Sequence, residues 1–208
     1  MDAVGDVGES AVGSRAPGTG HVLVAPDKFK GSLTAREAAE AIAGGIASAR
    51  PAVPVRGVPV ADGGDGTVRA ALAAGFRAVT AEVTGPTGRP VPAEFAVRGD
   101  VAVVEVAAAC GLALLDGATA PMTASSAGVG DLLRAAARAG CRTVVLGLGG
   151  SASTDGGAGM VRALGGRAWD ASGRPPRDGG IGLAETTGLD LSTVADEVRG
   201  LDVVLACD

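Results

Sequence analysis

Aromatic side chains are almost missing from this chain: Phe and Trp together make up 2% of the residues, and Tyr does not occur. Proteins that hold nucleic acid use aromatic rings to stack bases and a basic face to meet phosphates. Here the net charge is −5. We therefore predict no nucleic-acid partner, and we expect a core of Ala, Val and Leu, because hydrophobic residues still reach 47%.

Long apolar runs are also absent, so we predict no membrane span. Residues 1–20 have neither a basic n-region nor an apolar h-region, and we expect a disordered extension there. The three cysteines are far apart and lack metal-ligand spacing, which favours reduced thiols and a cytoplasmic location. His21 is the one histidine, so the sequence disfavours a Ser-His-Asp catalytic triad.

Lysine is the scarce cation: of 18 Lys and Arg residues only two are lysine, and both lie in Asp27–Gly31. This stretch follows the apolar run 22–25, where we expect a strand to end and a loop to begin. Binding groups of α/β folds gather at such edges. A compact ammonium suits a phosphate. We therefore interpret Lys28 and Lys30 as anion-binding residues, and two surface lysines that fall together by chance are the alternative.

The order of apolar segments predicts an α/β protein. We expect strands near 22–25 and 55–60, with helices from Thr34 to about 49 and at about 67–75, which is the opening of a parallel sheet. The motif Thr34-Ala-Arg-Glu37 is a capping box. Three meander-like strands are expected at 78–84, 91–98 and 101–107.

The rest of the chain continues this pattern. Its expected elements are a helix at about 125–139, a strand at 143–148, a helix at about 157–164, a turn-rich stretch at 170–180 and a strand at 203–206. We place a domain boundary near residue 77, where the composition changes.

Three loops share one design, in which an apolar strand is followed by small or acidic residues and then by a helix. They are 26–34, 61–67 and 149–157. Glycine lets backbone N–H groups approach a ligand closely, and carboxylates suit Mg²⁺ bound together with nucleotide phosphates. Phosphoryl transfer needs this combination of amides, ammonium groups and carboxylates. The Walker signature is absent, so a kinase here needs another architecture.

A dinucleotide site is a rival interpretation. The segment Gly147-Leu-Gly-Gly-Ser-Ala152 fits the G-x-G-x-x-A pattern, and Asp170 lies about twenty residues further on. A dinucleotide-binding oxidoreductase therefore stays open as a minor alternative.

Five blocks of the sequence resemble type I glycerate kinases, in the order in which that family has them. The blocks are Ala25-Pro-Asp-Lys-Phe-Lys-Gly-Ser-Leu-Thr34, Pro59-Val-Ala-Asp-Gly-Gly-Asp-Gly-Thr67, Ala107-Ala-Ala-Cys-Gly-Leu-Ala-Leu114, Gly149-Gly-Ser-Ala-Ser-Thr-Asp-Gly-Gly-Ala-Gly-Met160 and Ala206-Cys-Asp208. The resemblance implies phosphorylation of D-glycerate by Mg-ATP, most simply at the 2-hydroxyl. It also implies two α/β domains. One is a Rossmann- or flavodoxin-like parallel-sheet domain, and the other is an inserted domain with a mixed sheet.

Mapped on this chain, residues 21–76 form the N-terminal half of the first domain. Residues 77–208 form the inserted domain, which we expect to be truncated at its C-terminal end because family members are close to twice as long. A catalytically inactive fragment that at most binds ligand is therefore a second hypothesis. The family usually has Glu where this chain has Asp65.

We assign roles by combining the loops with the resemblance. Lys30 is expected to neutralise phosphate or hold the glycerate carboxylate, Asp208 to accept the hydroxyl proton, and Asp155 to bind Mg²⁺. Asp62 and Asp155 have the alternative of capping the helices that follow them. The residues expected to bind substrate or phosphate are Asp27, Lys28, Ser32, Asp62, Gly63, Gly64, Asp65, Gly66, Thr67, Gly149, Gly150, Ser151, Thr154, Gly156 and Gly157.

Overall fold

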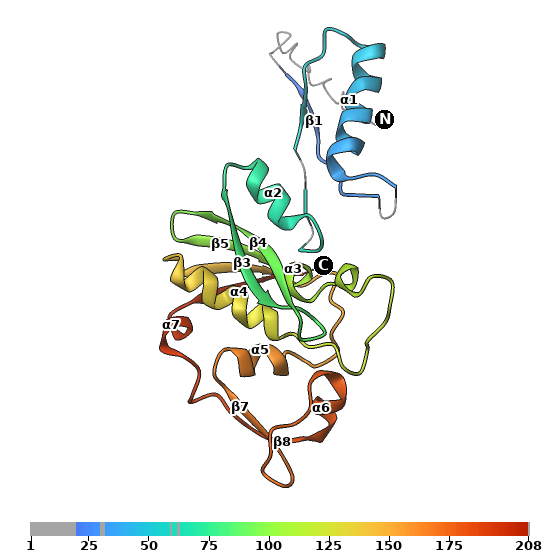
Figure 1. The fold of residues 1–208 in the computed structure, drawn as a ribbon. Helices are drawn as coiled ribbons and strands as arrows, with labels where there is room; N and C mark the ends of the chain where they lie inside the picture. Colours follow the sequence, from blue (N-terminus) through green and yellow to red (C-terminus); the bar gives the residue numbers. More distant parts are fainter. Residues whose placement is uncertain (1–19, 30–31, 59, 62, 208) are drawn as a thin grey trace, which may run out of the picture. The chain divides into compact units, whose positions relative to one another are not determined.

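The computed structural model describes residues 20–29, 32–58, 60–61, 63–207, and it divides the chain into two compact units, one up to Val58 and one from Pro59 (Figure 1). The extension predicted for 1–20 falls almost wholly outside the described residues. Among the described residues, no helix has both the length and the apolar character that a membrane crossing requires.

The first unit contains one helix and a two-stranded parallel sheet. Strand β1 (Val22–Val24) pairs in parallel with β2 (Val55–Gly57), and α1 (Ala35–Ala49) connects them. The predicted capping box is confirmed at the start of α1, where the Glu37 amide donates to Thr34 Oγ1 over 3.2 Å and the Thr34 amide donates to Glu37 Oε2 over 2.8 Å. This parallel β-α-β piece agrees with the predicted opening of a parallel sheet.

The second unit is built on a five-stranded mixed sheet with the order β3-β4-β5-β6-β9. Strands β3, β4 and β5 are antiparallel neighbours, as the meander predicted, whereas β6 and β9 continue the sheet in parallel from β5. The strands of this sheet are β3 (Arg77–Thr84), β4 (Pro90–Arg98), β5 (Val101–Glu105), β6 (Thr143–Gly147) and β9 (Asp202–Ala206). The α/β class and the mixed sheet are therefore as predicted.

Helices flank this sheet (Figure 1). They are α2 (Thr67–Ala73), α3 (Val106–Cys110), a 3₁₀ turn (Leu112–Leu115), α4 (Ala127–Arg138), α5 (Ala158–Ala163), α6 (Gly179–Glu185) and α7 (Asp196–Arg199). A separate antiparallel pair consists of β7 (Arg167–Asp170) and β8 (Thr186–Asp190). β7, β8, α6 and α7 were not predicted from the sequence. The strand predicted for 101–107 ends at Glu105, after which the chain becomes helical.

The core of the second unit lies between the sheet and α4. Phe95, Val104, Leu132 and Val144 are fully buried there. Most other core residues are Ala and Val, as the shortage of aromatics required. Burial of such side chains is the main stabilising term of a domain.

The observed unit boundary, at residues 58 and 59, differs from the predicted one near 77. Helix α2 packs on β4 and β5, where Val68 contacts Ala96 and Val103 in a small apolar cluster. This burial assigns α2 to the second unit, although its sequence directly continues the β-α-β pattern of the first.

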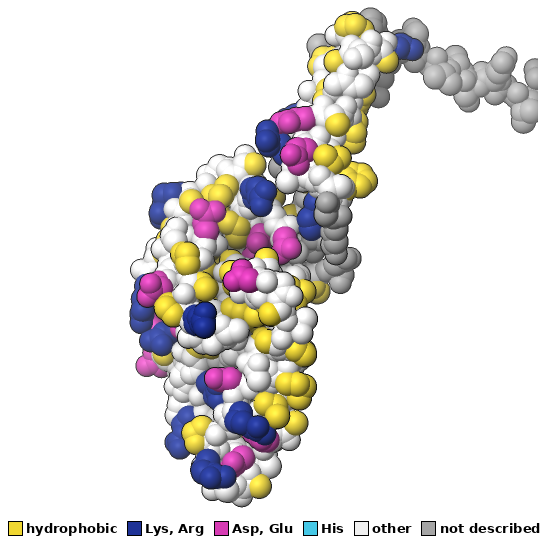
Figure 2. Space-filling view, turned by 45° about the vertical axis from the view of Figure 1, so that its right-hand side comes forward, with side chains coloured by type: hydrophobic (Ala, Val, Ile, Leu, Met, Phe, Trp, Pro, Cys, Tyr) yellow, Lys and Arg dark blue, Asp and Glu magenta, His cyan; other side chains and the backbone are white. Residues whose placement is uncertain are grey.

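The surface of the second unit mixes charges of both signs. Figure 2 shows Lys and Arg side chains interspersed with Asp and Glu over the face that is seen. That face has no continuous basic stripe of the kind that nucleic-acid-binding proteins carry.

Candidate functional site

Two of the three predicted loops meet at one edge of the mixed sheet. The Gly149 amide donates to the Gly63 carbonyl over 3.1 Å, and the Leu148 amide donates to the Ala206 carbonyl over 3.1 Å. The turn after residue 62, the turn after β6 and the end of β9 are thus joined by backbone hydrogen bonds. Because β5, β6 and β9 are parallel, their carboxyl ends share this edge, which is where ligands of open α/β sheets bind.

Glycine is required at this junction because the backbones touch. A Cβ on Gly63 would be 2.1 Å from the Ala206 carbonyl oxygen, and one on Gly147 would be 2.4 Å from the Gly63 carbonyl oxygen. A Cβ on Gly149 would be 2.4 Å from Gly64 Cα. These distances are far below van der Waals contact, so no other residue fits without a backbone shift.

Asp65 lies against the second turn. Its Oδ1 is 2.6 Å from the position that a Cβ on Gly150 would occupy, and Gly150 has a φ of +73°. The Asp65 side chain is exposed, so this carboxylate and Gly150 form an accessible polar surface at the sheet edge. Thr67, also predicted to bind ligand, donates its hydroxyl to the Gly64 carbonyl over 2.8 Å and thereby closes the turn.

Glu105, the last residue of β5, holds this turn through hydrogen bonds, and no role was predicted for it from the sequence. Its Oε1 accepts the Gly66 amide over 3.0 Å and the Val68 amide over 2.6 Å. Burial raises the pKa of the Glu105 carboxyl, and the charge of Asp65 raises it further, while the two amides and Arg69 act in the opposite direction. An acidic residue directly after the apolar run 101–104 was the signal available in the sequence.

Two predicted ligand-binding amides are therefore engaged within the protein. The Gly66 amide donates to Glu105, and the Gly149 amide donates to Gly63. These bonds favour a structural role for both residues.

The second half of the 149–157 loop makes its contacts elsewhere. Thr154 Oγ1 donates to the Pro121 carbonyl, and a Cβ on Gly156 would be 3.0 Å from Leu183 of α6. Gly157 is the left-handed N-cap residue of α5. Ser151 lies between the two regions, where its hydroxyl is 3.1 Å from that of Ser153. The loop predicted as one cradle is thus divided between two environments.

Asp155 has the contacts of a helix cap. Its side chain is 1% exposed. Oδ2 accepts the Ser126 amide, the Ser126 hydroxyl and the Gly159 amide, and Oδ1 accepts the Gly157 amide, all over 2.8 to 3.1 Å. One carboxylate therefore caps both α4 and α5, which favours the capping alternative over the predicted magnesium role.

The lysine loop belongs to the first unit. There Lys28 Nζ lies 3.7 Å from Asp27 Oδ1, and the Lys28 amide donates to the same oxygen over 2.7 Å. The Ser32 hydroxyl donates to the Phe29 carbonyl over 3.2 Å. The predicted roles of Lys30, Asp62 and Asp208 lie outside the described residues.

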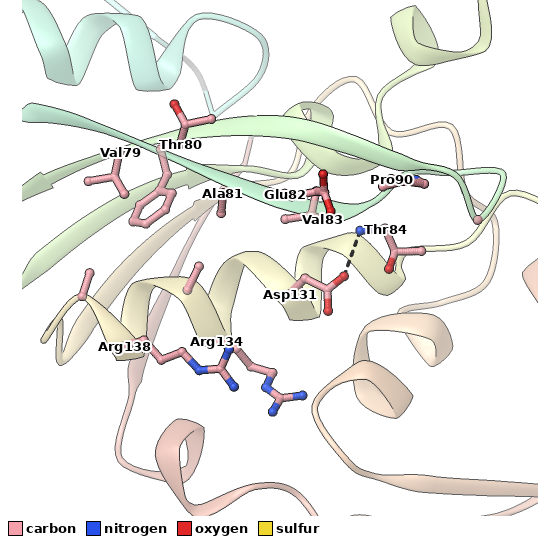
Figure 3. A pocket seen from close by; sticks show the side chains of 14 residues that line it. Val79, Thr80, Ala81, Glu82, Val83, Thr84, Pro90, Asp131, Arg134 and Arg138 are labelled. Carbon is pink, nitrogen blue, oxygen red and sulfur yellow. Dashed lines mark hydrogen bonds between the residues drawn. The ribbon is translucent and has the colours of Figure 1, made fainter.

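A groove of about 810 Å³ lies on another part of the second unit, between β3 and α4 (Figure 3). The Thr84 amide donates to Asp131 Oδ2 at its side over 2.9 Å. Arg134 and Arg138 line it, and both donate to Glu197 of α7. None of the residues predicted to bind substrate lines this groove.

The topology does not fit the dinucleotide alternative. That motif requires a helix immediately after the glycines and an acidic residue at the end of the next parallel strand. Here α5 begins only at Ala158, and Asp170 ends β7, which pairs with β8 outside the main sheet. Asp170 Oδ1 instead accepts the amides of Ser172 and Arg174 in a tight turn.

Comparison with known proteins decides the relationship. The sequence profile of the glycerate kinase family matches residues 22–208. The chain belongs to the glycerate kinase family. It is 44% identical over 191 residues to a glycerate kinase of Bacillus subtilis (strain 168), covering 90% of this chain and 50% of that protein. It is 41% identical, with the same coverage, to a glycerate 2-kinase of Escherichia coli (strain K12).

A solved structure supports the glycerate kinase fold. The crystal structure assigned to glycerate kinase 2 from Salmonella typhimurium LT2 matches with a TM-score of 0.75 and 42% identity, covering 90% of this chain and 52% of that one. The predicted family resemblance is therefore confirmed. The chain spans about half the length of the glycerate kinases it matches.

Proposed function

We propose that this chain takes part in the ATP-dependent phosphorylation of D-glycerate at the 2-hydroxyl, giving 2-phosphoglycerate and ADP. The observation that carries the proposal is the junction of the Gly63–Thr67 turn, the Gly147–Gly150 turn and the end of β9 at one sheet edge. Membership of the glycerate kinase family supports the same substrates. Phosphorylation of the 3-hydroxyl is the less favoured version.

The transfer joins the hydroxyl oxygen of glycerate to the γ-phosphorus of ATP as the bond from that phosphorus to the ADP oxygen breaks. In this proposal Asp208 accepts the hydroxyl proton, and Lys30 neutralises charge on the phosphate or on the glycerate carboxylate. Such a transition state is stabilised mainly by positioning and by nearby charge.

Among the described residues, Asp65 fits a magnesium ion better than Asp155 does. Magnesium in such sites uses one or two carboxylates together with phosphate oxygens. The Asp65 carboxylate is exposed at the junction, whereas Asp155 is buried and its hydrogen bonds are all within the protein. Magnesium would supply charge neutralisation on the ATP phosphates, and Asp65 together with the backbone of Gly150 would orient that charge at the sheet edge.

Release of ADP that depends on added D-glycerate, followed in a coupled assay, tests the proposal. The two lysines offer a matched pair, because Lys30→Met is expected to reduce turnover by about 100-fold or more, whereas Lys28→Met is expected to have a smaller effect. Unchanged turnover in Lys30→Met would contradict the proposed role of Lys30 in phosphoryl transfer. Product analysis by ³¹P NMR separates the 2-phosphate from the 3-phosphate.

The chain's match to half of each relative supports a second candidate, a module that binds ligand without turnover. Calorimetric titration with Mg-ATP and with D-glycerate separates the two. Heat of binding without ADP release would favour the binding module, and the absence of both would contradict both candidates.

A further inference from the structure

The side chain of Glu105 is placed to hold the candidate site in shape. It leaves the sheet at the carboxyl end of β5, which is central in the order β3-β4-β5-β6-β9. From there a single oxygen, Oε1, accepts the amides of Gly66 and Val68. Such paired hydrogen bonds to a carboxylate fix the position of the donor backbone and are stronger than neutral ones.

The turn that Glu105 holds has no capping side chain of its own. The N-cap residue of α2 is Gly66, which has a left-handed φ of 105° and makes no side-chain cap. Helix starts normally use Ser, Thr, Asp or Asn to satisfy their first amides. Here that task falls to a residue 39 positions later in the chain.

The hydrogen bonds of Glu105 also affect the position of Asp65. Asp65 immediately precedes Gly66, and the charge of Asp65 acts on Glu105. A movement of the Gly66 amide therefore moves the carboxylate that lies against Gly150. We propose that Glu105 is the positioning residue of the site, which fixes the Gly63–Thr67 turn so that Asp65 faces the Gly147–Gly150 turn.

The effect on turnover rests on the proposed function, but the anchoring itself does not. Two variants separate the possibilities. Glu105→Gln keeps an oxygen that accepts both amides, whereas Glu105→Ala removes it. Glu94→Ala is the matched control, because Glu94 is an exposed strand glutamate of β4 away from the junction.

Amide hydrogen exchange, measured by NMR on the full chain, tests the anchoring directly. We expect the Gly66 and Val68 amides to lose at least tenfold protection in Glu105→Ala and to keep it within about threefold in Glu105→Gln and Glu94→Ala. Equal protection in all three variants would overturn the proposal. An equal loss throughout the second unit in Glu105→Ala would also overturn it, because that pattern indicates global destabilisation.

Steady-state kinetics test the consequence for the site. We expect Glu105→Ala to lower kcat by about 10–100-fold per folded molecule, because misplaced groups lose such factors, and Glu105→Gln to restore most of that loss. A merely structural role would reduce the amount of folded protein and leave kcat and KM per folded molecule unchanged. If the unaltered chain shows no turnover, the proposed function fails while hydrogen exchange still decides the role of Glu105.

Discussion

At the scale of single residues, two aspartates in glycine-rich turns have opposite environments. Asp65 is exposed beside Gly150, whereas Asp155 is 1% exposed and accepts four hydrogen bonds. Both follow the same pattern in sequence, an apolar strand and then small residues. Burial therefore separates a carboxylate available to a ligand from one that holds two helix starts together.

Replacement of Asp155 by Ala should destabilise the second unit strongly. The change leaves the buried amides of Ser126 and Gly159 and the partly buried amide of Gly157 without their acceptor, and we expect the free energy of unfolding to fall by about 3 kcal/mol. Denaturant unfolding followed by circular dichroism measures it. Asp196→Ala is the control, because that side chain is fully exposed. A loss no larger than that of the control would contradict the capping role.

Glu105 should make stability depend on pH in a characteristic direction. Burial raises the pKa of Glu105 in the folded chain, with the Val68 and Gly66 amides opposing the shift, Asp65 adding to it and Arg69 opposing it. A raised folded pKa means that its contribution to stability is fully present below the unfolded pKa and is lost as pH rises through the folded one.

Relative to Glu105→Gln, the unaltered chain should therefore lose stability as pH increases from about 4.3, the ordinary glutamate pKa, towards neutrality. Urea unfolding of both proteins at several pH values measures the difference. A difference that grows in favour of the unaltered chain with rising pH would show that the amides outweigh burial.

At the scale of elements, the site depends on glycines where backbones cross. Gly147→Ala places a Cβ about 2.4 Å from the Gly63 carbonyl oxygen, so either β6 or the Gly63–Thr67 turn must shift. We expect the free energy of unfolding to fall by about 1–3 kcal/mol, measured by denaturant unfolding. We also expect altered amide chemical shifts in residues 63–67, measured by NMR. Gly200→Ala is the matched control, since nothing lies within 4 Å of its Cβ position. Unchanged amide shifts in that turn would contradict the close crossing.

The elements predicted well from sequence are those with strong local signals. The capping box of Thr34 and Glu37 predicts the start of α1. The helical spacing of apolar residues predicts α4. The pair β7 and β8 lacks such signals, because its strands are short, only partly buried and outside the main sheet. Their formation depends on tertiary contacts, which override weak local preference.

The candidate site was predictable in part for the same reason. Glycines next to Asp65 and after β6 predicted loops whose backbone approaches a ligand, and the structure brings these two loops against each other. The acidic residue after the apolar run 101–104 points to Glu105, but no local pattern identifies its hydrogen-bond partner, which lies 39 residues away. The capping role of Asp155 likewise depends on a hydrogen bond from Ser126, which is also distant in sequence. Local chemistry thus indicated where the chain turns, and packing decided which side chains face the junction.

At the scale of the whole molecule, the last strand leaves apolar surface open. Val203, Val204 and Leu205 of β9 are 44%, 52% and 59% exposed, and β9 is the edge strand next to β6. Consecutive residues of a strand point to opposite faces, so both faces of this edge are uncovered. Exposed apolar edge strands promote association through their unpaired backbone groups.

We therefore expect the chain on its own to associate as its concentration rises, and a charge on this strand to oppose that association. Val204→Lys should shift the weight-average mass, measured by sedimentation velocity over a concentration series, towards the monomer. Leu191→Lys is the matched control, because Leu191 is 55% exposed outside the sheet and gains the same charge. An equal shift in both variants would assign the effect to net charge, and a monomer at all concentrations would contradict the edge as an association surface. A shift confined to Val204→Lys locates the association at β9, since only there does the added charge meet unpaired strand backbone.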